Sequence, residues 1–415
     1  MKRKEGTPIK LWSRLILAVV ILAAVWMVGV ALAAPQATPQ AAARPHPLTS
    51  DQAFKNVRVL KGIPLDDFMG TMGVMSASVG FDCSECHIGA GTDKVDWAAD
   101  NPKKVTARRM VLMVAAINRD NFGGQQMVTC WTCHHGRDHP ATTPALETVY
   151  GPGSTEMDDV LRQEPGEPPA EQILDKYIEA IGGTQRLSSL KSYIAKGKSI
   201  GFGGFGGGGA VSIFAKSPDL RTVFIDFTET PDRGDETRSY DGKTGWLRTP
   251  LNVLSEYELT GGELDGARLD ALMGFPGQLK QVLTNLHVSL PTTISDLPGP
   301  SSQTSRESGE GLGKDRVVNV VQGSGPRGIL VTMYFDKTTN LLLRVVRYAK
   351  TPIGRVPTQI DYADYRDIGN GVKMPFHMTF AWLDGRDAIQ LSEVQTNVPI
   401  DAKWFGRPAQ QKARN

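Results

Sequence analysis

The chain has 415 residues, 40% of them hydrophobic, and a formal net charge of +2 at pH 7. This length leaves room for two ordinary domains. The small net charge, together with the absence of a basic stripe or of basic residues interleaved with aromatic ones, gives no electrostatic basis for a nucleic-acid partner.

The N-terminal segment has a basic end followed by an uncharged apolar run from Leu15 to Ala34. Such a run is either a long secretory signal or a membrane-spanning helix, because about 20 apolar residues span a bilayer. Ala31-Leu32-Ala33 is typical of a cleavage site. We predict a signal peptide or N-terminal membrane anchor over residues 1–34 and a Pro, Ala and Gln spacer over 35–47. In both cases the remaining chain lies in the periplasm or on the periplasmic side of the inner membrane.

Residues 48–139 are predicted to form a small helical unit in which a helix, a loop and a cysteine motif occur twice. Apolar side chains at three- and four-residue steps predict a first helix that ends before Gly80 and a second from Val105 to Asn118. The first stripe contains Leu65, Phe68, Met69, Met72 and Met75, and the second contains Ala107, Met110, Val111, Val114 and Ile117.

Each predicted helix precedes the sequence Cys-x-x-Cys-His, the attachment sequence of c-type haem. Two thiols three residues apart lie on one helical turn and can form thioethers with both vinyl groups of one haem. The His one turn after the first Cys can reach the iron. We therefore predict two covalently bound haem c groups with His87 and His134 as iron ligands. The thioether-forming residues are Cys83, Cys86, Cys130 and Cys133, which are all four cysteines of the chain.

A structural zinc site is the alternative interpretation of two Cys-x-x-Cys pairs. A zinc site does not need a His directly after each pair, whereas both pairs here have one. The repeated His favours haem.

The sixth ligand of each iron is expected to be a Met thioether or a second imidazole. Met72 precedes Cys83 by eleven residues, and Met110 precedes Cys130 by twenty. Spacing alone does not separate these two from their neighbours, because a Met at helical spacing is commonly a core residue. The other candidates are Met69, Met75 and Met113 on or near the stripes, and His135 and His139 beside the second motif.

Three further residues of this unit are candidates for contact with haem. Arg108 or Arg109 can neutralise a propionate, and we expect at most one to do so, because neighbouring helix positions point in different directions. Trp131 is expected to pack on a porphyrin edge.

A proline-rich stretch, residues 140–169, is predicted to be a linker. The helical stripe from Ile173 to Ile181 follows it, and Leu264 to Leu286 is predicted as the other helical stretch. Alternating runs separated by turn signals predict antiparallel strands, with Gly201–Gly209 as a hairpin loop rather than a phosphate site. These runs are 192–200, 210–215, 221–227, 316–321, 329–335, 341–348, 358–365, 377–382 and 388–394.

The predicted fold class is therefore a multidomain chain. A small all-α dihaem cytochrome c domain covers residues 48–139, and an antiparallel, β-rich, half-barrel-like α+β domain covers residues 170–408.

Residues from about Val57 to Gly136 resemble the cytochrome c subunit of photosynthetic reaction centres. The matching text is Val59-Leu60, Phe68 through Met72, Ala107-Arg108-Arg109-Met110, Ala116-Ile117-Asn118, and Val128-Thr129-Cys130 through His134. The resemblance implies that Met72 and Met110 are the sixth ligands. The family normally binds four haems, whereas this chain has the motifs for one pair, so the resemblance is to a two-haem variant.

The C-terminal region resembles periplasmic lipoprotein carriers of the LolA/LolB type in its helix-then-strands order, with the Phe335-Asp336 turn before Leu341. In that family a half-barrel of antiparallel strands binds acyl chains on its concave face. No catalytic constellation occurs here, so a ligand- or partner-binding module is expected.

The predicted function is an exported or membrane-anchored dihaem c-type cytochrome that transfers electrons and is not an enzyme. Its expected partners are redox proteins, including a membrane photosynthetic or respiratory complex. Two alternatives stay open from the sequence: a dihaem peroxidase-like enzyme with one open haem, and a lipid- or ligand-binding protein with a redox-sensing haem domain.

Overall fold

A computed structural model of the chain describes residues 47–92, 94–140, 142–143, 161–199, 208–227, 234–249, 254–295, 315–383 and 385–408. The predicted signal or anchor, the predicted spacer up to residue 46, the middle of the predicted linker and most of Gly201–Gly209 lie outside these residues. Within them, no helix is long and apolar enough to cross a membrane.

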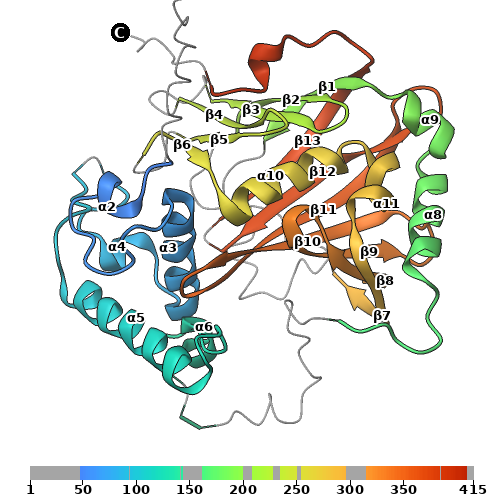
Figure 1. The fold of residues 1–415 in the computed structure, drawn as a ribbon. Helices are drawn as coiled ribbons and strands as arrows, with labels where there is room; N and C mark the ends of the chain where they lie inside the picture. The colour runs from blue at the N-terminus through green and yellow to red at the C-terminus, as the bar shows by residue number, and fades with distance from the viewer. Residues whose placement is uncertain are drawn as a thin grey trace, which may run out of the picture. The chain divides into compact units, whose positions relative to one another are not determined.

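Residues 47–143, called the helical segment below, contain short and long helices in alternation (Figure 1). The two long helices occur where the apolar stripes predict them. Gly80 ends the first one with a positive φ of 70°, which glycine adopts without steric cost. The helices are α2 (Ser50–Ala53), α3 (Leu65–Val79), α4 (Cys83–Cys86), α5 (Pro102–Asn121) and α6 (Cys130–His134).

The rest of the described chain forms one antiparallel sheet of 13 strands with helices on it. The strands are β1 (Ser192–Ser199), β2 (Ala210–Lys216), β3 (Leu220–Asp226), β4 (Asp235–Tyr240), β5 (Gly245–Arg248), β6 (Glu256–Leu259), β7 (Thr284–Ile294), β8 (Arg316–Ser324), β9 (Leu330–Asp336), β10 (Leu342–Thr351), β11 (Gly354–Asp367), β12 (Lys373–Trp382) and β13 (Gly385–Thr396). The helices are α8 (Ala170–Ala180), α9 (Thr184–Ser189), α10 (Gly261–Met273) and α11 (Leu279–Val282), with the single turns η1 (Pro276–Gln278), η2 (Pro326–Gly328) and η3 (Ala402–Trp404).

The strands follow the order β6-β5-β4-β3-β2-β1-β13-β12-β11-β10-β9-β8-β7. Neighbours in the sheet are therefore hairpin partners except at β1 and β13, where the first and last strands pair, with Tyr193 opposite Thr396. All nine runs predicted as strands lie in this sheet. The prediction of an antiparallel, β-rich region with helices is confirmed.

Some elements were not predicted. The strands β4 to β7 and the helix α9 are absent from the sequence-based prediction, and the helix predicted from Leu264 to Leu286 was wrong beyond Val282, because β7 begins at Thr284. β7 is the edge of the sheet and contains Pro291, which an edge strand tolerates but which weakens a strand signal.

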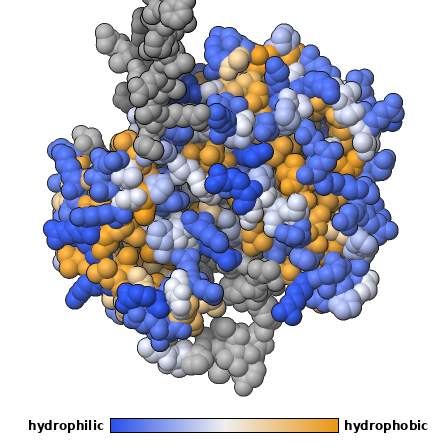
Figure 2. All heavy atoms as spheres, viewed as in Figure 1, coloured by the Kyte–Doolittle hydropathy of each residue, from blue (hydrophilic) through white to orange (hydrophobic). Residues whose placement is uncertain are grey.

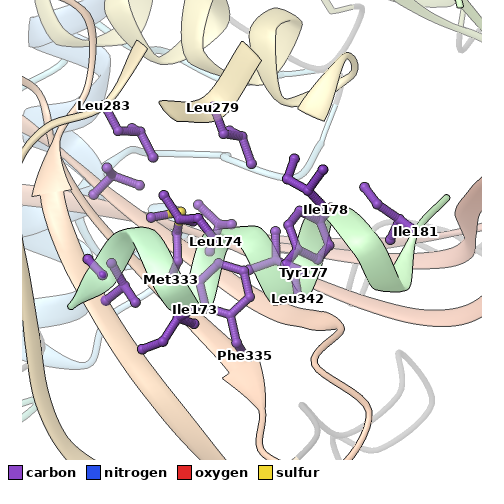
Figure 3. Close-up of a cluster of buried hydrophobic side chains, with 14 of the residues drawn as sticks. Ile173, Leu174, Tyr177, Ile178, Ile181, Leu279, Leu283, Met333, Phe335 and Leu342 are labelled. Carbon is purple, nitrogen blue, oxygen red and sulfur yellow. The ribbon is translucent and has the colours of Figure 1, made fainter. Parts of the chain in front are cut away.

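The largest core cluster lies between α8, α11 and the strands β7 to β10 (Figure 3). The helix α8 presents Ile173, Leu174, Tyr177 and Ile178 to Met333, Phe335 and Leu342 of the sheet, with Leu279 and Leu283 on its other side. Leu174 and Met333 are fully buried. The sheet is therefore held by helices packed on one face, as its alternating pattern requires.

The helical segment shares core residues with the sheet through α3. Leu65 at the start of α3 is 2% exposed and belongs to a cluster with Tyr240, Leu259 and Ala267. Next to it, the carboxylate of Asp66 accepts hydrogen bonds from the backbone N–H (2.5 Å) and the hydroxyl (2.6 Å) of Thr260, the residue before α10. These contacts attach the first long helix to the sheet and to α10.

Candidate haem-attachment sites

The first Cys-x-x-Cys-His motif forms a single helical turn, α4, with a capped start. The Asp82 side chain accepts a hydrogen bond from the backbone N–H of Ser84 at 2.8 Å, and hydrogen bonds from Ser84 hold the pKa of Asp82 below its usual value. The backbone N–H of His87 donates to the carbonyl of Cys83 at 2.9 Å. Cys83, Cys86 and His87 therefore have the one-turn spacing that the attachment chemistry requires.

The imidazole of His87 is suited to bind a metal. Its Nδ1 atom is buried and has no hydrogen-bond partner among the described residues. Burial, followed by the charge of Lys104, lowers the pKa of His87 to about 4, so the ring is neutral at pH 7. Its ring lies edge-on to that of Trp97, with centroids 5.0 Å apart. A neutral imidazole is the form that coordinates iron.

The second motif forms the helical turn α6 and starts with a reciprocal cap, in which the side chain of Thr129 accepts from the backbone N–H of Thr132 and the side chain of Thr132 accepts from that of Thr129. The Nδ1 atom of His134 lies 2.9 Å from the carbonyl oxygen of Arg137. A carbonyl only accepts, so Nδ1 carries the proton and the lone pair of Nε2 is free. This is the tautomer of a His that binds a metal through Nε2.

None of the four cysteines forms a disulfide. Cys83 and Cys133 are exposed, and Cys86 and Cys130 are half-buried. Burial raises the pKa of the Cys86 and Cys130 thiols. Each motif thus offers one accessible thiol and one that packs against the protein.

Two asparagines fix the loops that carry the motifs, and the sequence analysis gave neither a role. Asn118 is 8% exposed; its amide donates to the carbonyl of Val128 at 2.7 Å and accepts from the backbone N–H groups of Met127 and Val128 at 3.0 and 2.9 Å. Asn101 caps α5 and donates to the carbonyl of Cys86 at 2.8 Å. The sequence indicates Asn118 only by its position, because it is a polar residue in line with the apolar stripe of α5.

Met72 lies on the side of α3 that faces away from the sheet. A Cβ at Gly70 would lie 3.2 Å from Val356, and the Cγ1 of Val74 lies 3.0 Å from the Cβ position of Gly354, so Gly70 and Val74 face the sheet. Met72 is two residues from each, a rotation of about 200° on an α-helix. Its side chain is half-buried.

Met110 is half-buried on α5 next to the buried Val111, whereas Met113 is 43% exposed. α5 contacts both motif helices, α4 and α6, and α6 also contacts α3. The backbone N–H of Gly136 donates to the carbonyl of Ser78 at 2.8 Å, so the end of α3 lies directly against the turn after α6. Thus α5, which carries Met110, contacts both motifs, and α3, which carries Met72, contacts the second.

Other residues predicted to contact haem or iron lie on α5 and after the second motif. Arg108 is ion-paired to Asp100 at 2.7 Å, whereas Arg109 is exposed and has no carboxylate partner among the described residues. His135 is exposed and its ring is tilted against that of Trp131, with centroids 5.6 Å apart. The side chain of His139 is 86% exposed beside Asp138. Of the two arginines, Arg109 is the one whose guanidinium is free for a propionate.

Apolar side chains gather on the surface of the helical segment (Figure 2). Of the ten large hydrophobic side chains that are exposed among the described residues, eight lie in this segment: Leu48, Ile88, Val105, Leu112, Met113, Phe122, Met127 and Trp131. A segment of this size with two porphyrins attached would cover such side chains with apolar macrocycle. The residues present therefore fit haem c.

A metal ion bound by protein side chains alone needs at least three His, Cys, Asp or Glu residues close together. No such group occurs within the described residues.

Comparison with known proteins shows a similarity in the N-terminal part of the chain. The family model of the photosynthetic reaction centre cytochrome c subunit matches residues 26–158. The photosynthetic reaction center cytochrome c subunit of Thermochromatium tepidum is 33% identical over 108 residues, which make up 25% of this chain and 25% of that protein. The chain therefore spans about a quarter of the length of that curated relative. The resemblance expected from the sequence is confirmed, and the matched residues include both motifs, Met72 and Met110.

Solved structures show a partial likeness to this chain. A LolA superfamily protein from Nitrosomonas europaea covers 58% of this chain and 99% of its own, with 14% identity and a TM-score of 0.37. A DUF1329 family protein from Desulfovibrio piger covers 58% of this chain and 98% of its own, with 11% identity and a TM-score of 0.34. The first of these is named as a LolA superfamily protein, the type that the sequence resembles.

Proposed function

We propose that this chain is an exported c-type cytochrome that transfers electrons through two covalently bound haem c groups. The observation that carries the proposal is the repeated Cys-x-x-Cys-His motif: each copy forms one capped helical turn, with His87 directly after the first turn and His134 at the end of the second. The family match over residues 26–158 supports the same class of protein. When bound, haem c supplies one-electron chemistry between ferric and ferrous iron.

In this proposal the residues of the chain have three roles. The thiols of each motif hold one porphyrin, and His87 and His134 bind the irons through neutral imidazoles. Met72 and Met110 close the sixth positions, which raises the reduction potential and keeps small substrates away from the iron. Asn101 and Asn118 keep the motif loops in place, so that the ligands move little when the charge changes. These roles describe an electron carrier and not an enzyme.

The proposed partners are redox proteins on the outer side of a bacterial inner membrane. The uncharged run from Leu15 to Ala34 is consistent with export or anchoring there. The relative from Thermochromatium tepidum is named as a reaction center subunit, so a photosynthetic or respiratory membrane complex is the class of partner we propose.

The proposal is tested by producing the full chain in a host that matures c-type cytochromes. The mass of the purified protein should exceed that of the processed polypeptide by two haems, and the alkaline pyridine spectrum should show saturated vinyl groups. The Cys130→Ser/Cys133→Ser double variant should lose one haem and keep the other. A wild-type protein with the mass of bare polypeptide would contradict the proposal.

Carbon monoxide separates the carrier from an enzyme with an open iron. The reduced wild-type protein should not bind carbon monoxide at neutral pH, because both sixth positions are closed by Met. Binding at either haem would favour the peroxidase-like alternative.

A further inference from the structure

The hairpin between β10 and β11 ends in a buried apolar side chain. Thr351 and Gly354 pair across a two-residue turn, and the Thr351 hydroxyl donates to the carbonyl of Gly354 at 2.8 Å. Ile353 at the tip is 1% exposed. A hairpin tip usually lies in solvent and carries polar or small residues. An isoleucine there therefore needs a partner surface.

That partner surface is the interior of the helical segment. Ile353 forms one cluster with Val74 of α3 and Val111 of α5, which are 4% and 6% exposed. Packed against this cluster are Val59, Leu60, Met75, Cys130, Val356 and Leu383. Ile353 is thus the sheet's contribution to a core that also contains the first cysteine of the second motif.

Two other contacts fix the hairpin on the second motif. The side-chain amide of Gln126, four residues before Cys130, donates to the carbonyl of Thr351 at 2.9 Å across 225 residues of sequence. A Cβ at Gly354 would lie 3.8 Å from the Cβ of Thr129, the residue that caps α6. The hairpin therefore contacts the loop and the cap of the second motif, and its tip belongs to the cluster against which the first cysteine packs.

We propose that Ile353 is a positioning residue for the second haem: the tip of the β10–β11 hairpin holds α6 against α3 and α5, and thereby sets the ligation and potential of that haem. The inference rests on the proposed function and adds a role for the sheet. It follows from packing, because α6 is a single turn of five residues and cannot hold its own orientation. Removing the Ile353 side chain would leave a cavity in the cluster against which Cys130 packs.

The experiment compares Ile353→Ala with Ile389→Ala in the full, haem-loaded chain. Ile389 is an equally suitable site for the control, because it is 2% exposed in a different cluster of the sheet. The potentials of both haems are measured by redox titration, and the Cys83→Ser/Cys86→Ser variant, which keeps only the second haem, assigns the two waves. Carbon monoxide binding to the reduced proteins is measured in parallel.

We expect Ile353→Ala to lower the potential of the second haem, to leave that of the first unchanged, and to allow carbon monoxide to bind the second haem. Ile353→Leu should restore both properties, and Ile389→Ala should lower the unfolding temperature without changing either. If Ile353→Ala is not recovered, Gln126→Ala, which removes only one part-buried hydrogen bond to the hairpin, should produce a smaller shift of the same sign.

Three outcomes overturn the inference. If the second haem keeps its wild-type potential and does not bind carbon monoxide in the Ile353→Ala protein, or in Gln126→Ala where that is the variant recovered, the hairpin has no positioning role while the proposed function stands. If Ile389→Ala shifts the second haem as much as Ile353→Ala, the effect is general destabilisation. A wild-type chain without haem would overturn both proposals together.

Discussion

Met110 and Met113 lie one turn apart on α5 and differ in their surroundings, because Met110 is half-buried and Met113 is 43% exposed. Met110→Ala should leave both haems attached, lower the potential of the second haem and allow it to bind carbon monoxide, since the thioether that closes the iron is gone. Met113→Ala should change none of these properties. The measurement is a redox titration with optical spectra of the reduced protein. The opposite result for the two variants would assign the ligand to Met113.

A second prediction concerns Asn118 and does not depend on which residues bind the irons. Asn118→Ala removes three part-buried hydrogen bonds and leaves the N–H and the carbonyl of Val128 without these partners, so it should lower the free energy of unfolding by about 1–3 kcal/mol. Asn121→Ala on the exposed end of the same helix should change it by about 0.5 kcal/mol or less. Denaturant unfolding of the two variants checks this. Equal effects would mean that the Asn118 bonds contribute no net stability.

At the scale of residues, the side chains that would attach haem could be predicted from the sequence, but the side chains that hold them in place could not. The spacing of Cys83, Cys86 and His87 within five residues indicates haem attachment, because the geometry of the haem requires that spacing. Asn118 stood in the matched sequence without a role, since its partners at Met127 and Val128 become visible only when the loop is folded. Arg108 and Arg109 could not be separated from the sequence, because the ion pair with Asp100 depends on how α5 packs.

At the scale of elements, the first turn of α3 contains the carboxyl group of Asp67, whose negative charge destabilises the folded protein. Burial raises the pKa of Asp67 to about 6 from a usual 3.8, and the neighbouring charges of Asp66 and Glu263 add to it. The folded protein therefore binds this proton more tightly than the unfolded chain does. Its contribution to stability is greatest below about pH 4 and is lost as the pH rises through about 6.

Asp67→Asn should accordingly raise the unfolding temperature at pH 7, and the difference from wild type should shrink as the pH falls to about 4. Asp100→Asn provides a contrast of opposite sign, because the hydrogen bond from Arg108 lowers the pKa of Asp100. That variant should be less stable than wild type at pH 7, and its deficit should shrink only as the pH falls below the usual carboxyl pKa of 3.8. Thermal unfolding from pH 7 down to about pH 2 measures both effects. A stabilisation by Asp67→Asn that is independent of pH would exclude the charge as its cause.

The elements that could be predicted are those whose apolar pattern is complete within one stretch of sequence. α3, α5 and α8 each bury one face and end at or near a glycine, so their periodicity is clear. β7 could not be predicted in the same way, because it is an exposed edge strand interrupted by Pro291. The hairpin tip at Ile353 gave no local signal, since the surface that buries it lies in a distant part of the sequence.

At the scale of the whole molecule, the helical segment and the sheet share two sets of core residues. Leu65 packs with Tyr240 and Leu259, and Val74 and Val111 pack with Ile353. Separate domains joined by a linker keep their own cores, and their interfaces resemble those between transient partners. Here the helices of the haem-attachment sites are completed by side chains of the sheet, so we expect the described parts of both regions to unfold together.

The haem absorbance and the far-ultraviolet circular dichroism should therefore report the same single transition when the haem-loaded chain is heated. Leu65→Ala removes a buried side chain from the first shared cluster and should cost about 2–5 kcal/mol, because neighbours relax only partly around such a cavity. The variant should lower the transition temperature in both signals by the same amount, since a loss at the shared core destabilises both regions at once. Leu290→Ala, an exposed residue on β7, should leave both signals unchanged. Two separated transitions, with only the haem signal displaced by Leu65→Ala, would mean that the two regions fold independently and that the shared core does not couple them.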